Sequence, residues 1–177
     1  NGCANPAGWE TQVVAGDYDW TFGLETNPKT TYAGTSMDGT CMAFFDDDLL
    51  DDSAAFSNVR LMTPWFDGSQ YGRFELTFDI IMRYYREKVA VYVQHADGSE
   101  YLVTEAAFDI GGPHFPDYIH AALDLSPFRA QQMRVVFEYD DGQSYAWWIG
   151  LDNIKITGSG VANDICLNAT PLQTGAN

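Results

Sequence analysis

The amino-acid sequence predicts an all-β protein built as an antiparallel β-sandwich. Apolar residues recur at every second position in several short segments, and turn residues separate these segments at short spacing. Aromatic residues make up 15% of the chain, which suits the packing of one sheet on another. Apart from a turn near residues 128–132, no segment has the periodicity of an amphipathic helix. A chain of 177 residues is long enough for one domain with a sizeable core.

The expected strands are short and bounded by turn residues. Every second residue of 76–82 is apolar, which predicts a strand with one buried face. Asp97-Gly98 is a strong hairpin signal, so residues 89–93 and 101–104 should pair around it. The remaining expected elements are a long surface loop over residues 23–40 and strands over residues 9–14, 41–45, 58–64, 119–125, 135–139 and 145–158.

The composition is strongly acidic, with 25 Asp and Glu against 9 Lys and Arg and a formal net charge of −16. Phosphate backbones and anionic lipid surfaces attract positive charge, so neither nucleic acid nor an anionic membrane is an expected partner. No run of 18 apolar residues is present, so no membrane insertion is expected. Cations are the natural ligands of such a chain.

The segment 145–158 is rich in aromatic and β-branched residues and should form a buried strand, yet it carries Asp152 and Asn153 in its middle. Burial of an ionised carboxylate is costly unless a partner compensates for the lost water. Asp152 is therefore expected to face a metal ion, another cation or backbone donors. The alternative is an Asp at a bulge or strand end, bonded to neighbouring amides.

Two further acidic segments could converge with Asp152 at one edge of the sandwich. One follows Gly16, and the other holds five acids between residues 46 and 52. Calcium accepts about 6 to 8 oxygens in irregular geometry, which loops of this kind can supply. The alternative for the acidic run is a solvated loop, and the run lacks the spacing of an EF-hand. The predicted calcium ligands are Asp17, Asp19, Asp47, Asp48 and Asp152.

The three cysteines fit either an exported protein with one disulfide or a cytosolic protein with reduced thiols. Cys3 and Cys41 lie in the body of the chain, whereas Cys166 follows the last expected strand. We expect a Cys3–Cys41 disulfide and an unpaired Cys166. No CxxC pair or Cys/His cluster is present, which argues against a zinc site.

Arg83, Tyr84, Tyr85 and Arg86 combine two rings and two guanidinium groups directly after an expected strand. Sugars are held by aromatic platforms with a few polar groups, so these four residues are the predicted ligand-binding site. The alternative is a strand end with one ring in the core and the other outside.

Catalysis is not expected. Glycoside hydrolysis needs two carboxylates flanking the bond, and the best pair is Glu75 with Asp79 on one strand face, where such pairs usually contact only solvent. The histidines show no metal-binding spacing, and no Gly-x-Ser-x-Gly motif is present.

Several short motifs follow one another in an informative order: Pro6-Ala7-Gly8-Trp9, Gly16-Asp17-Tyr18-Asp19-Trp20, Leu61-Met62-Thr63-Pro64, Val89-Ala90-Val91-Tyr92-Val93 and Trp148-Ile149-Gly150-Leu151-Asp152-Asn153-Ile154. In this order they resemble the cleaved-adhesin and choice-of-anchor domains of secreted bacterial surface proteins, which are related in shape to MAM domains. The resemblance implies a jelly-roll sandwich, structural calcium and an extracellular or cell-surface location.

Residues 1–158 are accordingly expected to form one adhesin-like domain. Residues 159–177 should form a linker or the start of a following module, because Asn163-Asp164-Ile165-Cys166 resembles the opening of a further module. The resemblance implies a non-catalytic module of a multidomain adhesin. Its expected partners are a glycan or protein of a host or neighbouring cell and other domains of the same chain. The alternatives are a carbohydrate-binding module attached to a secreted enzyme and a passive spacer.

Overall fold

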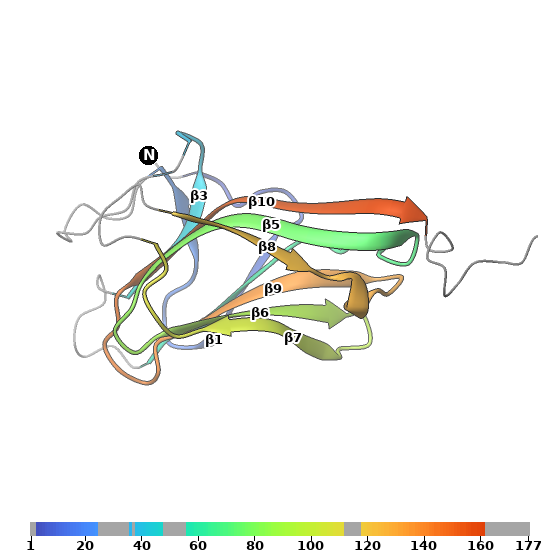
Figure 1. Ribbon diagram of the computed structural model, residues 1–177. Coiled ribbons are helices and arrows are strands. Elements are labelled where there is room, and N and C mark those ends of the chain that lie inside the picture. The colour runs from blue at the N-terminus through green and yellow to red at the C-terminus, as the bar shows by residue number, and fades with distance from the viewer. Residues whose placement is uncertain (1–2, 25–35, 37, 48–55, 112–117, 162–177) are drawn as a thin grey trace, which may run out of the picture.

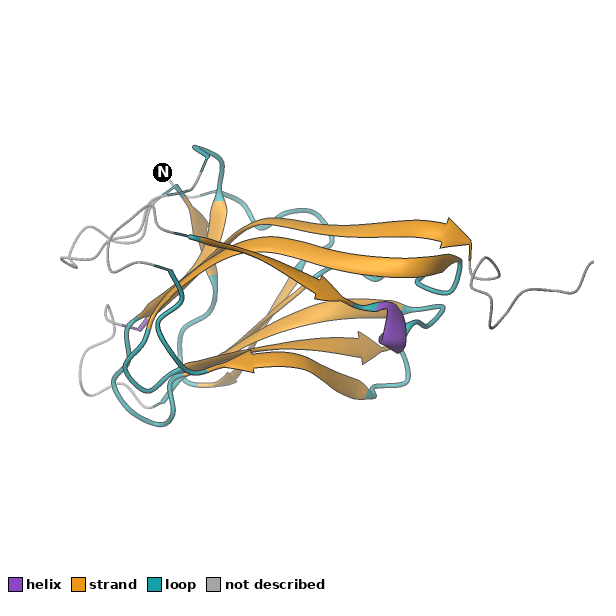
Figure 2. Cartoon of the chain, in the orientation of Figure 1, coloured by secondary structure: helices purple, strands orange, loops and turns teal. Residues whose placement is uncertain are grey.

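The computed structural model describes residues 3–24, 36, 38–47, 56–111 and 118–161. These residues form two facing five-stranded antiparallel sheets (Figures 1 and 2), which confirms the predicted all-β jelly-roll sandwich. One sheet contains, in spatial order, β1 (Glu10–Ala15), β4 (Asn58–Met62), β9 (Met133–Asp140), β6 (Lys88–His95) and β7 (Glu100–Ala106). The other contains β2 (Thr21–Gly23), β3 (Met42–Asp46), β10 (Trp148–Val161), β5 (Tyr71–Arg83) and β8 (Ile119–Asp124).

The core lies between the sheets, where side chains from alternate strand positions meet. Burial alternates along β5 as the sequence predicts, because each second residue points inward. Phe78 of β5 contacts Phe137 of β9 edge to face, with ring centroids 5.2 Å apart. Phe45 of β3 and Tyr139 of β9 also meet between the sheets, with tilted rings whose centroids are 4.9 Å apart. Burial of these apolar surfaces, at about 25 cal/mol per Å², holds the two sheets together.

β10 and β5 form the longest strand pair, which runs the whole length of both strands. A bulge between Asp152 and Lys155 interrupts its register, and Asn153 within it has a left-handed φ of 51°. On its other side β10 pairs with β3 only from Trp148 to Leu151. No described strand continues along that edge of β10, so the sheet is open from the bulge onward.

Some elements differ from the sequence-based expectation. The strand β2 begins just before the expected long loop; a strand of three residues is too short to show alternation. β10 begins at Trp148 and ends at Val161, because β5 offers backbone partners back to Tyr71. The helix-like turn expected near residue 128 is a 3₁₀ turn over Ser126–Phe128. Residues 162–177 lie outside the described part of the chain.

A disulfide joins Cys3 to Cys41, whose Cα atoms are 6.1 Å apart, and confirms the predicted pairing. It ties the start of the chain to β3, and the N–H of Cys3 donates to the carbonyl of Phe22 at 3.0 Å. Cys166 lies outside the described residues. The described residues include no helix that is long and apolar enough to cross a membrane.

Candidate binding site

A cleft of about 560 Å³ lies beside the open part of β10. Half-buried Ile154 and Ile156 line it from β10, since they alternate with the exposed Lys155 and Thr157. The other lining residues come from the chain before β1, from the connection between β4 and β5, and from β5 and β10 themselves. The complete lining is Trp9, Thr63, Pro64, Trp65, Phe66, Asp67, Gln70, Tyr71, Phe74, Ile154, Ile156 and Gly158.

Two exposed aromatic side chains border this cleft. Trp65 is 41% exposed and Tyr71 is 40% exposed, unlike the buried rings of the core. The Tyr71 ring packs edge to face on buried Phe74, with centroids 5.0 Å apart. It also lies on Gly158 of β10: a Cβ atom there would come within 2.6 Å of the ring. The absence of a side chain at Gly158 therefore makes room for Tyr71.

A residue of the first sheet, Arg134 of β9, holds the Trp65 ring in place. The guanidinium carbon of Arg134 lies 4.4 Å from its centroid, in cation–π contact. Arg134 in turn donates to Gln94 and Glu10, each at 2.6 Å. The next residue, Phe66, exchanges backbone hydrogen bonds with Met133 at 2.9 and 3.0 Å. Trp65 is thus fixed on a paired segment and not on a free loop.

The polar groups at the cleft are few. Oδ1 of Asp67 accepts hydrogen bonds from the hydroxyl and the N–H of Ser69, at 2.7 and 2.8 Å. These bonds lower the pKa of Asp67, so its carboxyl group is ionised at neutral pH. The exposed amide of Gln70 lies at the same rim. The hydroxyl of Thr63 is already bonded to Pro64 and Val135 inside the fold.

A second hollow of about 250 Å³ adjoins the first and shares Trp9 and Ile154 with it. Its polar side is Asp152, which is 6% exposed and accepts the N–H of Asn153 at 2.8 Å. This geometry corresponds to the alternative stated for Asp152, a carboxylate at a bulge bonded to a neighbouring amide. Cys41 also lines this hollow, so the disulfide lies beside it.

The predicted calcium ligand Asp47 lies elsewhere. It is buried, accepts hydrogen bonds from Ser57 and Ala146 at 3.1 and 2.9 Å, and bonds through its own N–H to Trp147. Asp47 lies opposite Trp147, the residue before β10, which is five positions from Asp152, about 16 Å at roughly 3.3 Å per residue. The structure does not bring these two carboxylates together.

The other predicted calcium ligands do not complete a site within the described residues. Asp17 is exposed, and Asp19 accepts hydrogen bonds from Thr11 at 2.6 Å and from the N–H of Trp20 at 2.7 Å. Asp48 lies outside the described residues. In the described part of the chain, no three His, Cys, Asp or Glu side chains converge so as to hold a metal ion. The described residues therefore do not by themselves fit the five-ligand site.

Burial of Asp47 shifts its titration. Desolvation raises the pKa of Asp47 to about 6. The hydrogen bonds from Ala146 and Ser57 lower it in part, and the nearby charges of Asp141 and Glu87 add smaller increases. Burial also raises the pKa of Asp141, whose carboxylate accepts the N–H groups of Ser57 and Gln143. This end of the sandwich thus gathers several buried carboxylates.

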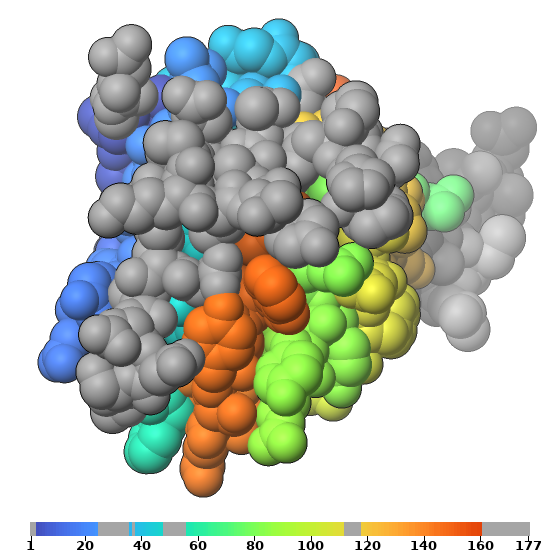
Figure 3. All heavy atoms as spheres, turned by 90° about the vertical axis from the view of Figure 1, so that its left-hand side faces the viewer, coloured from blue at the N-terminus to red at the C-terminus, as the bar shows by residue number. Residues whose placement is uncertain are grey.

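The predicted ligand-binding residues Arg83, Tyr84, Tyr85 and Arg86 lie at the turn between β5 and β6, at the opposite end of β5 from Tyr71. Tyr84 and Tyr85 are 36% and 52% exposed, so the alternative with one ring in the core is wrong. The guanidinium of Arg86 lies 5.6 Å from the ring centroid of Tyr85. Figure 3 looks onto this end, where the 80s and the 140s of the chain adjoin.

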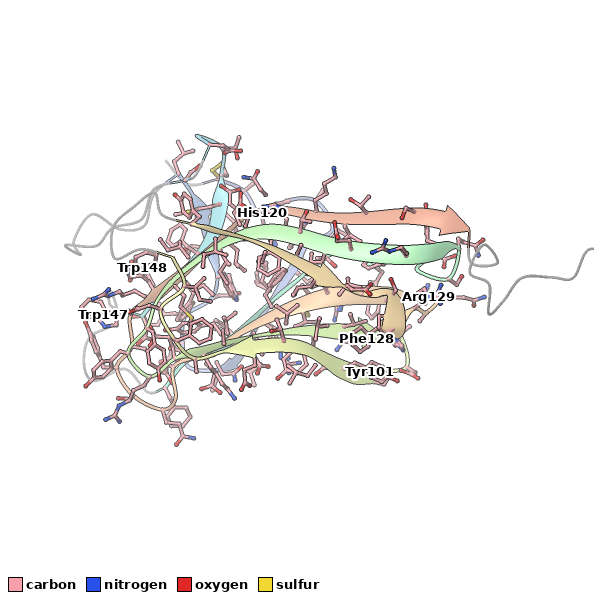
Figure 4. All side chains as sticks on the ribbon, viewed as in Figure 1. Tyr101, His120, Phe128, Arg129, Trp147 and Trp148 are labelled. Carbon is pink, nitrogen blue, oxygen red and sulfur yellow. A yellow bond between two sulfur atoms is a disulfide. The ribbon has the colours of Figure 1, made fainter. Side chains whose placement is uncertain are left out.

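Trp147 belongs to this end surface, as Figure 4 shows, and lies on the far side of the molecule from Arg129. Its ring centroid is 5.9 Å from the guanidinium of Arg83 and its side chain is half-buried, whereas Trp148, the first residue of β10, is buried. Buried Glu87 fixes the surface because its carboxylate accepts the N–H groups of Tyr85, Arg86 and Trp147 at 2.6, 2.8 and 3.1 Å.

The paired acids considered for catalysis lie on the outer face of β5 and not in the cleft. The carboxylate of Asp79 is bonded to His120 at 2.7 Å and to the side-chain amide of Asn153 at 2.9 Å. Glu75 is exposed, four positions away along the same face. Neither residue lines the two hollows of the cleft.

The sequence did not predict a binding role for Trp9, Trp65 or Tyr71. The exposure of Trp65 could have been predicted, because it stands in a polar turn segment, where an indole is not expected to enter the core. Trp9 and Tyr71 gave no such signal. They border the cleft only because β3 stops short of the end of β10, which is a matter of non-local register.

Comparisons with known proteins agree with this architecture. The sequence model of the MAM domain family (meprin/A5/mu) matches residues 3–161. No curated protein sequence matches the chain. The K1 cleaved adhesin domain of Lys-gingipain from Porphyromonas gingivalis W83 is similar with a TM-score of 0.65 and 21% identity, over 90% of this chain and 95% of that domain. The K3 domain of the same protein gives 0.59 and 23%, over 88% and 93%.

A carbohydrate-binding protein is also similar in fold. TmCBM61, in complex with β-1,4-galactotriose, gives a TM-score of 0.57 at 13% identity, over 86% of this chain and 90% of that one. These three similar domains are two adhesin domains and one carbohydrate-binding module, which are kinds of binding module.

Proposed function

The chain belongs to the MAM domain family, and from this premise we propose that it is a non-catalytic binding module whose ligand is a carbohydrate. The observation that carries this proposal is the cleft beside β10, bordered by the exposed rings of Trp65 and Tyr71. Aromatic rings offer flat apolar faces to the C–H faces of sugar rings, while a few polar groups set the orientation. Asp67 and Gln70 supply such groups at the rim.

The cleft is pre-organised. Arg134 holds Trp65, and Phe74 and Gly158 define the position of Tyr71. A ligand that stacks on rings already held in place loses less conformational entropy on binding. The fold likeness to TmCBM61, whose structure contains β-1,4-galactotriose, supports a carbohydrate as the ligand class.

The setting that we propose is the surface of a bacterial cell or its medium, with the module acting in adhesion to a host or neighbouring cell. The fold likeness to two cleaved adhesin domains supports this setting. The Cys3–Cys41 disulfide supports it independently, because disulfides persist in oxidising compartments.

The end surface around Trp147 is the second candidate site. Its two guanidinium–ring contacts and the fixation by Glu87 favour it, and it contains all four predicted ligand-binding residues. A ligand bound there would contact Tyr85 and Trp147 on an outer surface and not inside a cleft.

An array of polysaccharides, followed by calorimetry on the best ligand, separates the two surfaces. We expect Trp65→Ala to weaken binding at least about tenfold, the equivalent of about 1.4 kcal/mol, because it removes an aromatic wall of the cleft. The matched variant Trp147→Ala should leave affinity unchanged. The reverse pattern would move the function to the end surface, and no binding to any polysaccharide would favour a protein ligand or a spacer.

A further inference from the structure

The charges around the cleft restrict its ligand further. Asp67 and Asp152 line its two hollows, and no Lys, Arg or His is among the described residues that line them. Asp67 stays ionised at neutral pH because its bonds to Ser69 lower its pKa. The chain as a whole carries a net charge of −16. Local and long-range fields therefore act in the same direction, against an anion.

The two nearby arginines are hydrogen-bonded within the fold, and the carboxylate of Glu10 partly neutralises Arg134. Arg134 is 12% exposed at its side chain, and it bonds Glu10 and Gln94 while its guanidinium faces the Trp65 ring. Arg129 donates to the carbonyls of Tyr71 and Gly72 at 2.8 and 3.2 Å. Neither lines the cleft, so a carboxylate or sulfate on a sugar would meet no cationic side chain among the described lining residues.

The two hollows adjoin along β10, an arrangement that suits one elongated site. They share Trp9 and Ile154 and follow β10 from Leu151 to Gly158, about 23 Å of strand at roughly 3.3 Å per residue. Trp9 borders both hollows and so stands between them. A site of this length accommodates several sugar rings in a row.

We propose that the cleft binds an uncharged glycan chain lengthwise and discriminates against acidic glycans. This inference rests on the proposed carbohydrate-binding function and specifies its ligand class. Asp67 has two roles here: its carboxylate accepts hydrogen bonds from sugar hydroxyls, and its charge repels a uronate.

The test compares each neutral polysaccharide that the protein binds with the same polymer after oxidation of its C6 hydroxyls to carboxylates. We expect the oxidised polymer to bind at least about tenfold more weakly at low ionic strength. The difference should narrow in 1 M salt, where the Debye length falls to about 3 Å. Asp67→Asn should reduce the difference in affinity between the neutral and the oxidised polymer at low salt. The Asn side chain still accepts hydrogen bonds from Ser69 but carries no charge. Asp79→Asn, on the outer face of β5, is the matched control and should leave the difference in affinity unchanged.

Chain length provides a second measurement on the wild-type protein. Oligosaccharides prepared from the bound neutral polymer should bind more tightly with each added sugar until the chain fills both hollows, after which affinity should level off. Affinity that is already maximal for a monosaccharide would overturn the lengthwise site.

Failure of the charge selectivity and failure of carbohydrate binding would give different results. Oxidised polymers that bind as well as or better than their neutral parents would overturn the charge selectivity, while the carbohydrate-binding function would stand. Failure of every neutral and acidic polysaccharide to bind would overturn the proposed function and this inference with it.

Discussion

At the scale of single residues, Asp47 shows how burial makes an ordinary carboxylate sensitive to pH. Its pKa is raised from 3.8 to about 6 in the folded protein, chiefly by desolvation. Between these values the folded state keeps a proton that the unfolded chain has lost. The free energy of unfolding therefore falls as the pH rises from about 4 to about 6, and this contribution levels off above the folded pKa.

We expect Asp47 to account for roughly 1–3 kcal/mol of that fall, given about 1.4 kcal/mol for each pKa unit. Asp47→Asn should flatten the profile and raise stability at pH 7, because Asn still offers an oxygen to Ser57 or Ala146. Urea denaturation from pH 4 to pH 8 measures this. Asp109→Asn, an exposed side chain, controls for net charge, and an unchanged profile in the Asp47 variant would contradict the assignment.

The second prediction for a single residue concerns Gly158. A Cβ atom at this position would lie 2.6 Å from the Tyr71 ring, so Gly158→Ala must displace that ring from the cleft. We expect a loss of about 1–3 kcal/mol in the free energy of unfolding, as for other overpacked sites, together with weaker carbohydrate binding. Thermal melting and calorimetry measure the two effects. Ser159→Ala, the exposed neighbour, should change neither; a normal affinity in Gly158→Ala would exclude Tyr71 from the binding site.

At the scale of elements, the Cys3–Cys41 disulfide closes a loop across 38 positions of sequence and anchors the start of the chain to β3. Cross-linking restricts the unfolded chain, so Cys3→Ser together with Cys41→Ser should lower the free energy of unfolding by about 2–4 kcal/mol. Thiol titration of the denatured, non-reduced wild type should find one free thiol, from Cys166. Three free thiols would contradict both the pairing and an exported setting.

Strand order and register explain how far the sequence could predict the structure. Alternation located β5, where one buried face leaves a period of two, while turn residues and short apolar runs located most of the other strands. It could not show that the pairing of β3 with β10 stops at Ala43 and Leu151 while β10 continues to Val161, since pairing length depends on residues distant in sequence. The cleft follows from that difference. It was therefore invisible, whereas the exposed tyrosines at the β5–β6 turn were predicted.

The same dependence on strand pairing explains why the sequence analysis placed Asp47 and Asp152 in one calcium site. The sequence indicates which segments are acidic, but the distance between two carboxylates depends on their positions along paired strands. Asp47 and Asp152 lie at the two ends of the β3–β10 pairing. Composition predicted one cluster, and the described residues place these two acids about 16 Å apart at roughly 3.3 Å per residue.

At the scale of the whole molecule, charge remains the basis for a calcium proposal. A net charge of −16 on 177 residues disfavours the compact state through self-repulsion, and an ion that binds only the folded state opposes this effect. Such an ion stabilises the fold by about 2.7 kcal/mol when it is present at a hundred times its dissociation constant. For a chain of this size that corresponds to roughly 5–10 °C in melting temperature.

Excess chelator should therefore lower the melting temperature of the wild type, and added calcium should restore it. Because Asp47 and Asp152 are separated, Asp47→Asn and Asp152→Asn distinguish the two ends of the β3–β10 pair: the variant that loses the response to chelator identifies the end that holds the ion. Asp79→Asn, which removes one charge from the outer face of β5, should keep the response. An unchanged melting curve in chelator, with no metal found by elemental analysis, would show that hydrogen bonds alone accommodate these buried carboxylates.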